Sequence, residues 1–77
     1  MRRVGTVSKT AQRLALVRWD GDHADRPDIG LEVVDESLSP VGRVVDVFGP
    51  VDRPYLAISP GEGVRPADLL GGKLYAR

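Results

Sequence analysis

The sequence VGRVVDVFGPVDRPYLAI, residues 41–58, decides the fold class of this chain. Two short apolar runs flank a segment that contains Pro50 and Pro54. Proline has no N–H group to donate to a β-sheet ladder, so both prolines are predicted at a turn or at a sheet edge. The stretch therefore predicts two β-strands, residues 41–48 and 55–59, joined by a stiff corner.

The rest of the chain repeats this pattern of short apolar runs between turn residues, with nine glycines and six prolines in total. No window keeps a helical apolar spacing over three turns without a glycine or a proline. Further strands are expected at residues 3–8, 13–19, 31–34 and 73–75, with a turn at 9–12 and one helical turn at 66–70. The strand at 13–19 is apolar on both faces, which indicates that both faces are covered.

Six short strands with tight turns predict an all-β fold, a small closed six-stranded β-barrel. Closure is favoured because it removes the exposed strand edges that so short a sheet would otherwise carry. A chain of 77 residues is long enough for one such domain, residues 1–77, with a small core.

Charge is balanced overall but uneven along the chain. Eleven basic and eleven acidic residues give a formal net charge of zero, so no global basic field indicates independent nucleic-acid binding. Residues 1–19 hold five basic residues and no acid, whereas residues 20–36 hold seven acids against Arg26 alone. Either neighbouring strands and loops neutralise one another, or the molecule has a two-faced surface that orients a partner.

Composition also bears on the compartment. The absence of cysteine excludes disulfides, thiolate metal sites and cysteine catalysis, and it suits a reducing compartment. No apolar run approaches the roughly 18 residues that cross a bilayer, and the N-terminus lacks the apolar core of a signal peptide. We expect a cytoplasmic protein without a membrane partner.

Candidate catalytic groups are few. His23 is the one histidine, beside Asp22 and Asp25 in an acidic, turn-rich stretch over residues 20–30 that is expected to be an exposed loop. It could bind a metal or carry protons, but a solvated loop residue is the simpler interpretation because no ligand spacing accompanies it. The loop lacks the EF-hand pattern, and the chain has no phosphate-binding glycine motif. We expect no enzymatic activity, no metal and no cofactor.

The sequence gives little support to direct RNA binding. The aromatic residues are Trp19, Phe48, Tyr55 and Tyr75. They do not alternate with basic residues at strand spacing, as a nucleic-acid surface would require. Contact with RNA is therefore expected only indirectly.

The predicted corner is a candidate protein-binding surface. Two close prolines reduce the conformational entropy of the segment before anything binds it, and Gly49 frees the backbone where Phe48 leaves its strand. The apolar or amphipathic side chains around the corner are Phe48, Val51, Tyr55 and Leu56. Aromatic residues are typical anchors of protein interfaces. Phe48 could equally be barrel core, and both interpretations stay open for it here, whereas the interface is the favoured interpretation for Pro54 and Tyr55.

The same residues resemble the signature of the GAR subunit of box H/ACA ribonucleoproteins, in which G-x-V-x-D-V-F-G-P-V-x-x-P-Y is typical. The matching positions are Gly42, Val44, Asp46, Val47, Phe48, Gly49, Pro50, Val51, Pro54 and Tyr55. The flanks agree, with VGTV at residues 4–7, IGLEVVD at 29–35 and LLGGKLY at 69–75. The resemblance thus covers nearly the whole chain, although the acidic stretch at 20–28 lies outside the motif.

This resemblance implies a six-stranded barrel without glycine-arginine-rich tails, like the minimal archaeal form. In that family the subunit is not a catalyst. It docks on the catalytic domain of the pseudouridine synthase subunit and influences the mobile loop that holds substrate RNA, so guide and substrate RNA would be served only indirectly. The docking residues it implies are Phe48, Gly49, Pro50, Val51, Pro54, Tyr55 and Leu56, with Val33 and Val47 as further contacts.

Two rival hypotheses belong to other classes. A PRC-type barrel shares the VGRVVDV strand and would make the chain an adaptor in ribosome maturation, but that group has no reason to keep F-G-P-V-x-x-P-Y together. A small metal-dependent enzyme would have to use His23 and the neighbouring aspartates.

Overall fold

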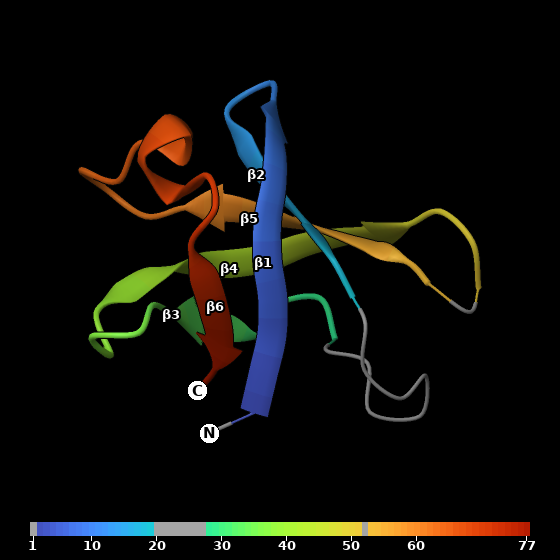
Figure 1. Cartoon of the computed structure of the whole chain (residues 1–77), viewed down its shortest axis with the longest axis horizontal. Coiled ribbons are helices and arrows are strands. Elements are labelled where there is room, and N and C mark those ends of the chain that lie inside the picture. Colours follow the sequence, from blue (N-terminus) through green and yellow to red (C-terminus); the bar gives the residue numbers. More distant parts are fainter. Residues whose placement is uncertain (1, 20–27, 52) are drawn as a thin grey trace.

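The chain folds into a closed antiparallel β-barrel. The computed structural model describes residues 2–19, 28–51 and 53–77. The strands are β1 (Arg2–Ala11), β2 (Leu14–Arg18), β3 (Glu32–Val34), β4 (Pro40–Phe48), β5 (Tyr55–Pro60) and β6 (Lys73–Ala76). They close in the order β1-β2-β5-β4-β3-β6 (Figure 1). The predicted fold class, an all-β six-stranded barrel, is confirmed.

A short helical element accompanies the strands in the described part of the chain. The turn predicted at 66–70 is the 3-10 helix η2 (Pro66–Leu69), which begins at a proline and packs against β1 and β2. Leu69 packs against the barrel core. Within the described residues, no helix is long and apolar enough to cross a bilayer.

The first hairpin differs from its prediction. Residues 9–12 were expected to turn, but β1 continues to Ala11 and the turn is formed by Gln12 and Arg13, at φ 51° and 67°. Two consecutive positive φ values are typical of the two-residue turns that join twisted antiparallel strands. The pairing of Ala11 with Leu14 fixes this turn, so strand pairing overrides the weak turn preference of the local sequence.

The long strand β1 closes the barrel because it belongs to both halves of the sheet. Its first half pairs with β6 and its second half pairs with β2, with register shifts between Arg3 and Gly5 and between Val7 and Lys9. Gly5 has φ +149°, and a Cβ there would lie 2.8 Å from both the Arg18 carbonyl oxygen and a methyl group of Val17. Only glycine therefore lets β1 bend so closely over β2.

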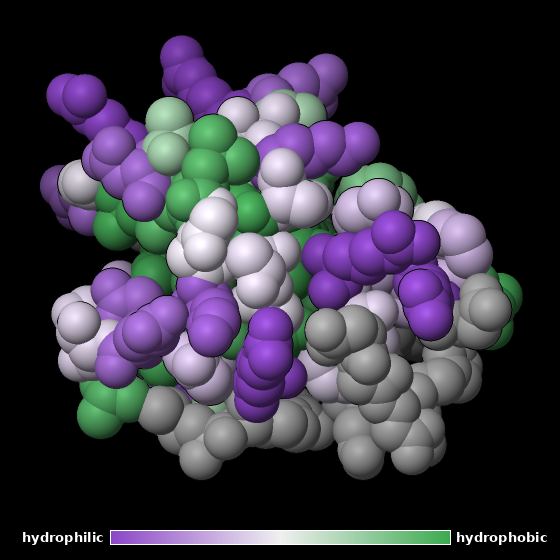
Figure 2. Space-filling model, viewed as in Figure 1, coloured by the Kyte–Doolittle hydropathy of each residue, from purple (hydrophilic) through white to green (hydrophobic). Residues whose placement is uncertain are grey.

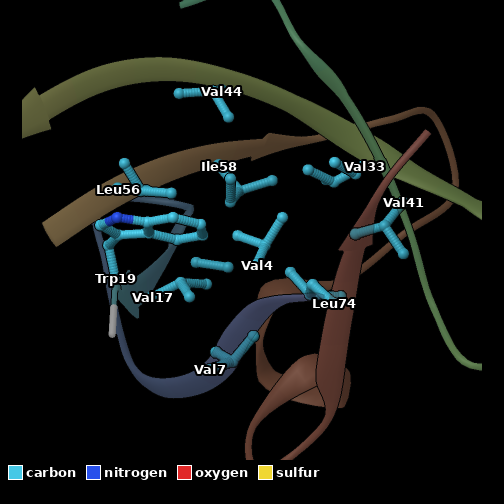
Figure 3. Close-up of a cluster of buried hydrophobic side chains, with 12 residues drawn as sticks. Val4, Val7, Val17, Trp19, Val33, Val41, Val44, Leu56, Ile58 and Leu74 are labelled. Carbon is cyan, nitrogen blue, oxygen red and sulfur yellow. The ribbon is translucent and has the colours of Figure 1, made fainter. Parts of the chain in front are cut away.

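The core is built mainly from branched aliphatic side chains that point inward from all six strands. Its buried members are Val4, Val7, Ala15, Val17, Trp19, Val33, Val41, Val44, Leu56, Ile58, Leu74 and Ala76 (Figure 3). Trp19 is the one aromatic member, and its indole ring lies beside Leu56 and Val17. The inward alternation of valine, leucine and isoleucine fills the small barrel without a central channel.

The middle of β2 is buried on its outer face as well. Leu16 alternates with the core residues Ala15 and Val17, so it points outward, yet it is only 7% exposed. Ala57, its partner across β5, is buried too. The expectation that this strand is covered on both faces holds at Leu16, whereas Arg18 on the same outer face is exposed.

We predict that Leu56→Ala destabilises the barrel by about 2–5 kcal/mol, because it removes a fully buried side chain and leaves a cavity. Urea unfolding followed by circular dichroism measures the change. Val51→Ala is the matched control, since Val51 is 74% exposed and its truncation should shift the free energy of unfolding by no more than about 0.5 kcal/mol. Equal stability of Leu56→Ala and wild type would contradict the placement of Leu56 in the core.

Candidate partner-binding corner

The segment from the end of β4 to the start of β5, residues 48–55 and here named the β4–β5 corner, projects from one end of the barrel (Figure 1). Phe48 pairs directly with Tyr55 across the two strands. Gly49 has φ +95°, a conformation that favours glycine. The Arg53 N–H donates to the Pro50 carbonyl oxygen at 3.2 Å. Asp52 lies outside the described residues.

The base of the corner is fixed to the barrel, whereas its tip is exposed. Pro54 is buried, and its carbonyl oxygen accepts a hydrogen bond from the Trp19 N–H at 2.9 Å, which ties the corner to the chain just after β2. Phe48 is 43% exposed and Val51 is 74% exposed. The corner thus presents apolar side chains on a backbone that is tied to the barrel at its base.

Tyr55 organises the side chains at the base of the corner. Its ring stacks on Phe48, with the ring centroids 5.7 Å apart and the planes at 19°. The Lys9 Nζ lies 5.5 Å from the centre of the Tyr55 ring, and the Arg18 Cζ lies 5.7 Å from it. β5 runs between β4 and β2, so Phe48 approaches the ring from one side and Arg18 from the other.

The structure brings most of the predicted docking residues together. Phe48, Gly49, Pro50, Val51, Pro54 and Tyr55 all belong to the corner. Phe48 and Tyr55, which could have been core from the sequence, lie on the outer face of the barrel and outside the buried core cluster.

Three other predicted residues are placed differently. Leu56 and Val33 are fully buried in the core, because they point inward from their strands. Val47 is half-buried and packs against the core from the position opposite Leu56. Leu56 and Val47 pack beneath the corner, whereas Val33 on β3 pairs with Gly42 near the other end of β4, and none of the three adds to the exposed surface of the corner.

Sequence reasoning missed Lys9 and Arg18 as members of this site. Arg18 points outward because its neighbours Val17 and Trp19 point into the core, and this alternation could have been read from the sequence. Lys9, however, pairs with Leu16 on β2 while its Nζ reaches Tyr55 on β5. Its aliphatic stem therefore crosses the outer face of β2 beside Leu16, which only the strand order reveals.

The clefts of the described surface are lined by charged as well as apolar residues. One of about 430 Å³ lies near the opposite ends of β4 and β5 and is lined in part by Glu32, Arg43 and Glu62. Another, of about 450 Å³, is lined in part by Arg13 and Arg65. Among the described residues, no group of three or more histidine, cysteine or acidic side chains is placed to hold a metal ion. His23 and the acidic stretch up to residue 27 lie outside those residues.

Comparison with known proteins leaves the chain classified by its fold alone. No protein-family description matches it, and no curated protein matches it. The class defined here is the small six-stranded antiparallel β-barrel, with an exposed apolar corner between β4 and β5.

We predict that Phe48 and Tyr55 are energetically coupled. A double-mutant cycle with Phe48→Ala, Tyr55→Ala and the double variant should give a coupling of about 0.5–1.5 kcal/mol in urea unfolding, because each truncation removes the same stacked contact. Effects that add to within about 0.3 kcal/mol would mean that the two rings contribute independently.

Proposed function

We propose that this chain is a non-catalytic, protein-binding subunit of an H/ACA RNA-guided pseudouridine synthase complex. It docks on the catalytic subunit in the cytoplasm, and it promotes the placement of substrate RNA and turnover without touching guide or substrate RNA itself. The observation that carries this proposal is the β4–β5 corner, in which Phe48 and Val51 are exposed on a backbone that is fixed at its base.

The physical case rests on preorganisation and exposure. An apolar residue that is exposed in the free protein gains free energy when a partner covers it. A loop that is already ordered loses little further entropy on binding. At the corner, both conditions hold for Phe48 and Val51, because the turn is closed between Arg53 and Pro50 and Phe48 is stacked on Tyr55.

The division of labour within the sequence motif supports the same proposal. The fold itself explains the residue type at several motif positions. Val44 is core, Pro54 is buried, and a Cβ on Gly42 would overlap the backbone of Ser59. Phe48 and Val51 have no such reason, since the barrel does not bury them. Exposed residues of a motif are the ones expected to meet a partner, and the resemblance to the GAR subunit supplies the partner's identity.

We predict that the purified chain alone has no pseudouridylation activity and only weak affinity for guide RNA. A tritium-release assay measures the first, and a filter-binding titration at physiological salt measures the second. A tight complex between the chain and guide RNA without other proteins would overturn the indirect role proposed for RNA.

We predict that the chain co-purifies with a catalytic subunit of an H/ACA pseudouridine synthase. Phe48→Ala and Tyr55→Ala should each weaken that complex by about 2 kcal/mol or more, measured by isothermal titration calorimetry, because each removes an aromatic anchor. The isolated variant barrels should stay folded by circular dichroism.

Leu70→Ala is the matched control for this experiment. Leu70 is also a large exposed apolar residue, at 50%, but it follows η2 at a distance from the corner (Figure 1). Its truncation should leave the affinity unchanged. If wild type fails to bind the catalytic subunit, the PRC-type adaptor becomes the better hypothesis, and binding to a ribosomal protein would be tested instead.

A further inference from the structure

We infer that the partner surface which binds the β4–β5 corner is acidic. It is a protein segment whose apolar side chains cover Phe48 and Val51 and whose carboxylates bind Lys9 and Arg18. The inference deepens the proposed function and rests on it in one respect, namely that the corner binds protein. It names the chemistry of the partner surface, which the sequence motif does not contain, since Lys9 and Arg18 lie outside that motif.

The first observation is the row of side chains across the outer face of the barrel. Phe48 on β4 is opposite Tyr55 on β5, and Tyr55 is opposite Arg18 on β2. Lys9 reaches the same tyrosine ring from β1. Four neighbouring strands thus place an exposed apolar side chain at one end of a continuous surface and two cations at the other. Figure 2 shows hydrophobic surface next to strongly hydrophilic side chains at the edge where Figure 1 places the corner.

The second observation concerns how the two cations are paired within the described residues. Neither Lys9 nor Arg18 forms an ion pair with a described residue. Among the described residues, the ion pair joins Arg77 to Glu32. Their contact with the Tyr55 ring contributes about 0.5–1 kcal/mol at an exposed site and leaves their N–H donors available. The ring therefore positions two cations that can still bind carboxylates, and this ordering favours affinity.

The third observation is the local balance of charge. The exposed Arg53 lies within the corner itself, and it adds a third basic residue to Lys9 and Arg18, which lie over the Tyr55 ring. The described carboxylate on the outer face of β4 is Asp46, which pairs with Ala57 and accepts the Val47 N–H at 2.8 Å. The described part of this surface is therefore locally basic, and this favours a partner of complementary sign.

The arrangement of the rings favours an acidic protein over single-stranded RNA. Bases bind by stacking on open aromatic faces. Tyr55 has Phe48 on one face and the two cations on the other, so it offers no free face to a base. The apolar tip at Pro50 and Val51 also suits an apolar pocket in a protein, whereas it has no contact to make with a phosphate backbone.

The first experiment measures binding of the catalytic subunit to wild type and to the double variant Lys9→Glu/Arg18→Glu by titration calorimetry at several salt concentrations. Charge reversal should weaken binding by about ten-fold or more at low salt, because it sets like charges against each other. The difference should shrink as salt rises, since exposed charges are screened. The affinity of Lys9→Gln/Arg18→Gln should lie between that of wild type and that of the charge-reversal variant.

The matched control is Arg13→Glu/Arg65→Glu, which reverses two exposed arginines. Arg13 is in the β1–β2 turn, at the opposite end of β2 from Arg18, and Arg65 immediately precedes η2. This variant has the same change of net charge and should bind within about two-fold of wild type if the effect is local. If wild type binds and Lys9→Glu/Arg18→Glu binds equally well, the inference is wrong while the proposed function stands.

A second experiment does not depend on the identity of the partner. A ten-residue peptide of leucine and glutamate, the same peptide with glutamine in place of glutamate, and oligouridylate are each titrated into the isotope-labelled chain and followed by NMR. The glutamate peptide should shift the resonances of Lys9, Arg18 and Phe48 and should bind about ten-fold more tightly than the glutamine peptide. Equal binding of the two peptides, no binding, or tighter binding of oligouridylate at these residues would overturn the inference.

Discussion

Closure of the barrel by β1 is the constraint on which the rest of the structure depends. This strand pairs with β6 in its first half and with β2 in its second. It can do so because it bends at Gly5, where a side chain would overlap the Arg18 carbonyl and Val17. Without that bend the sheet would keep two open edges, and so small a core would be exposed along them.

Closure also decides which side chains are available to a partner. In a closed barrel every strand divides into inward and outward positions. Leu56 and Val33 are inward and hold the core, whereas Phe48 and Tyr55 are outward. The apolar side chains of Phe48 and Val51 are therefore left exposed at the corner, because the barrel buries mainly its inward positions.

In the candidate site, Tyr55 combines a structural role with the binding role proposed for it. The ring supports Phe48 through stacking and positions Lys9 and Arg18 through its other face. Fold and site are coupled at this residue, because the strand order that closes the barrel is the order that brings β1, β2, β4 and β5 side chains to one ring. A surface ordered in this way needs little rearrangement to bind.

The sequence by itself determined the fold class and the position of the corner. Short apolar runs between glycines and prolines specify strands and turns locally, so β4, β5 and the β4–β5 corner could be predicted from residues 41–58. Only the tertiary structure decided which residues face outward at the corner, where the first hairpin turns, and that Lys9 lies over Tyr55. The physical reason is that local propensity depends on neighbours in the chain, whereas these features depend on the register between strands that are distant in sequence.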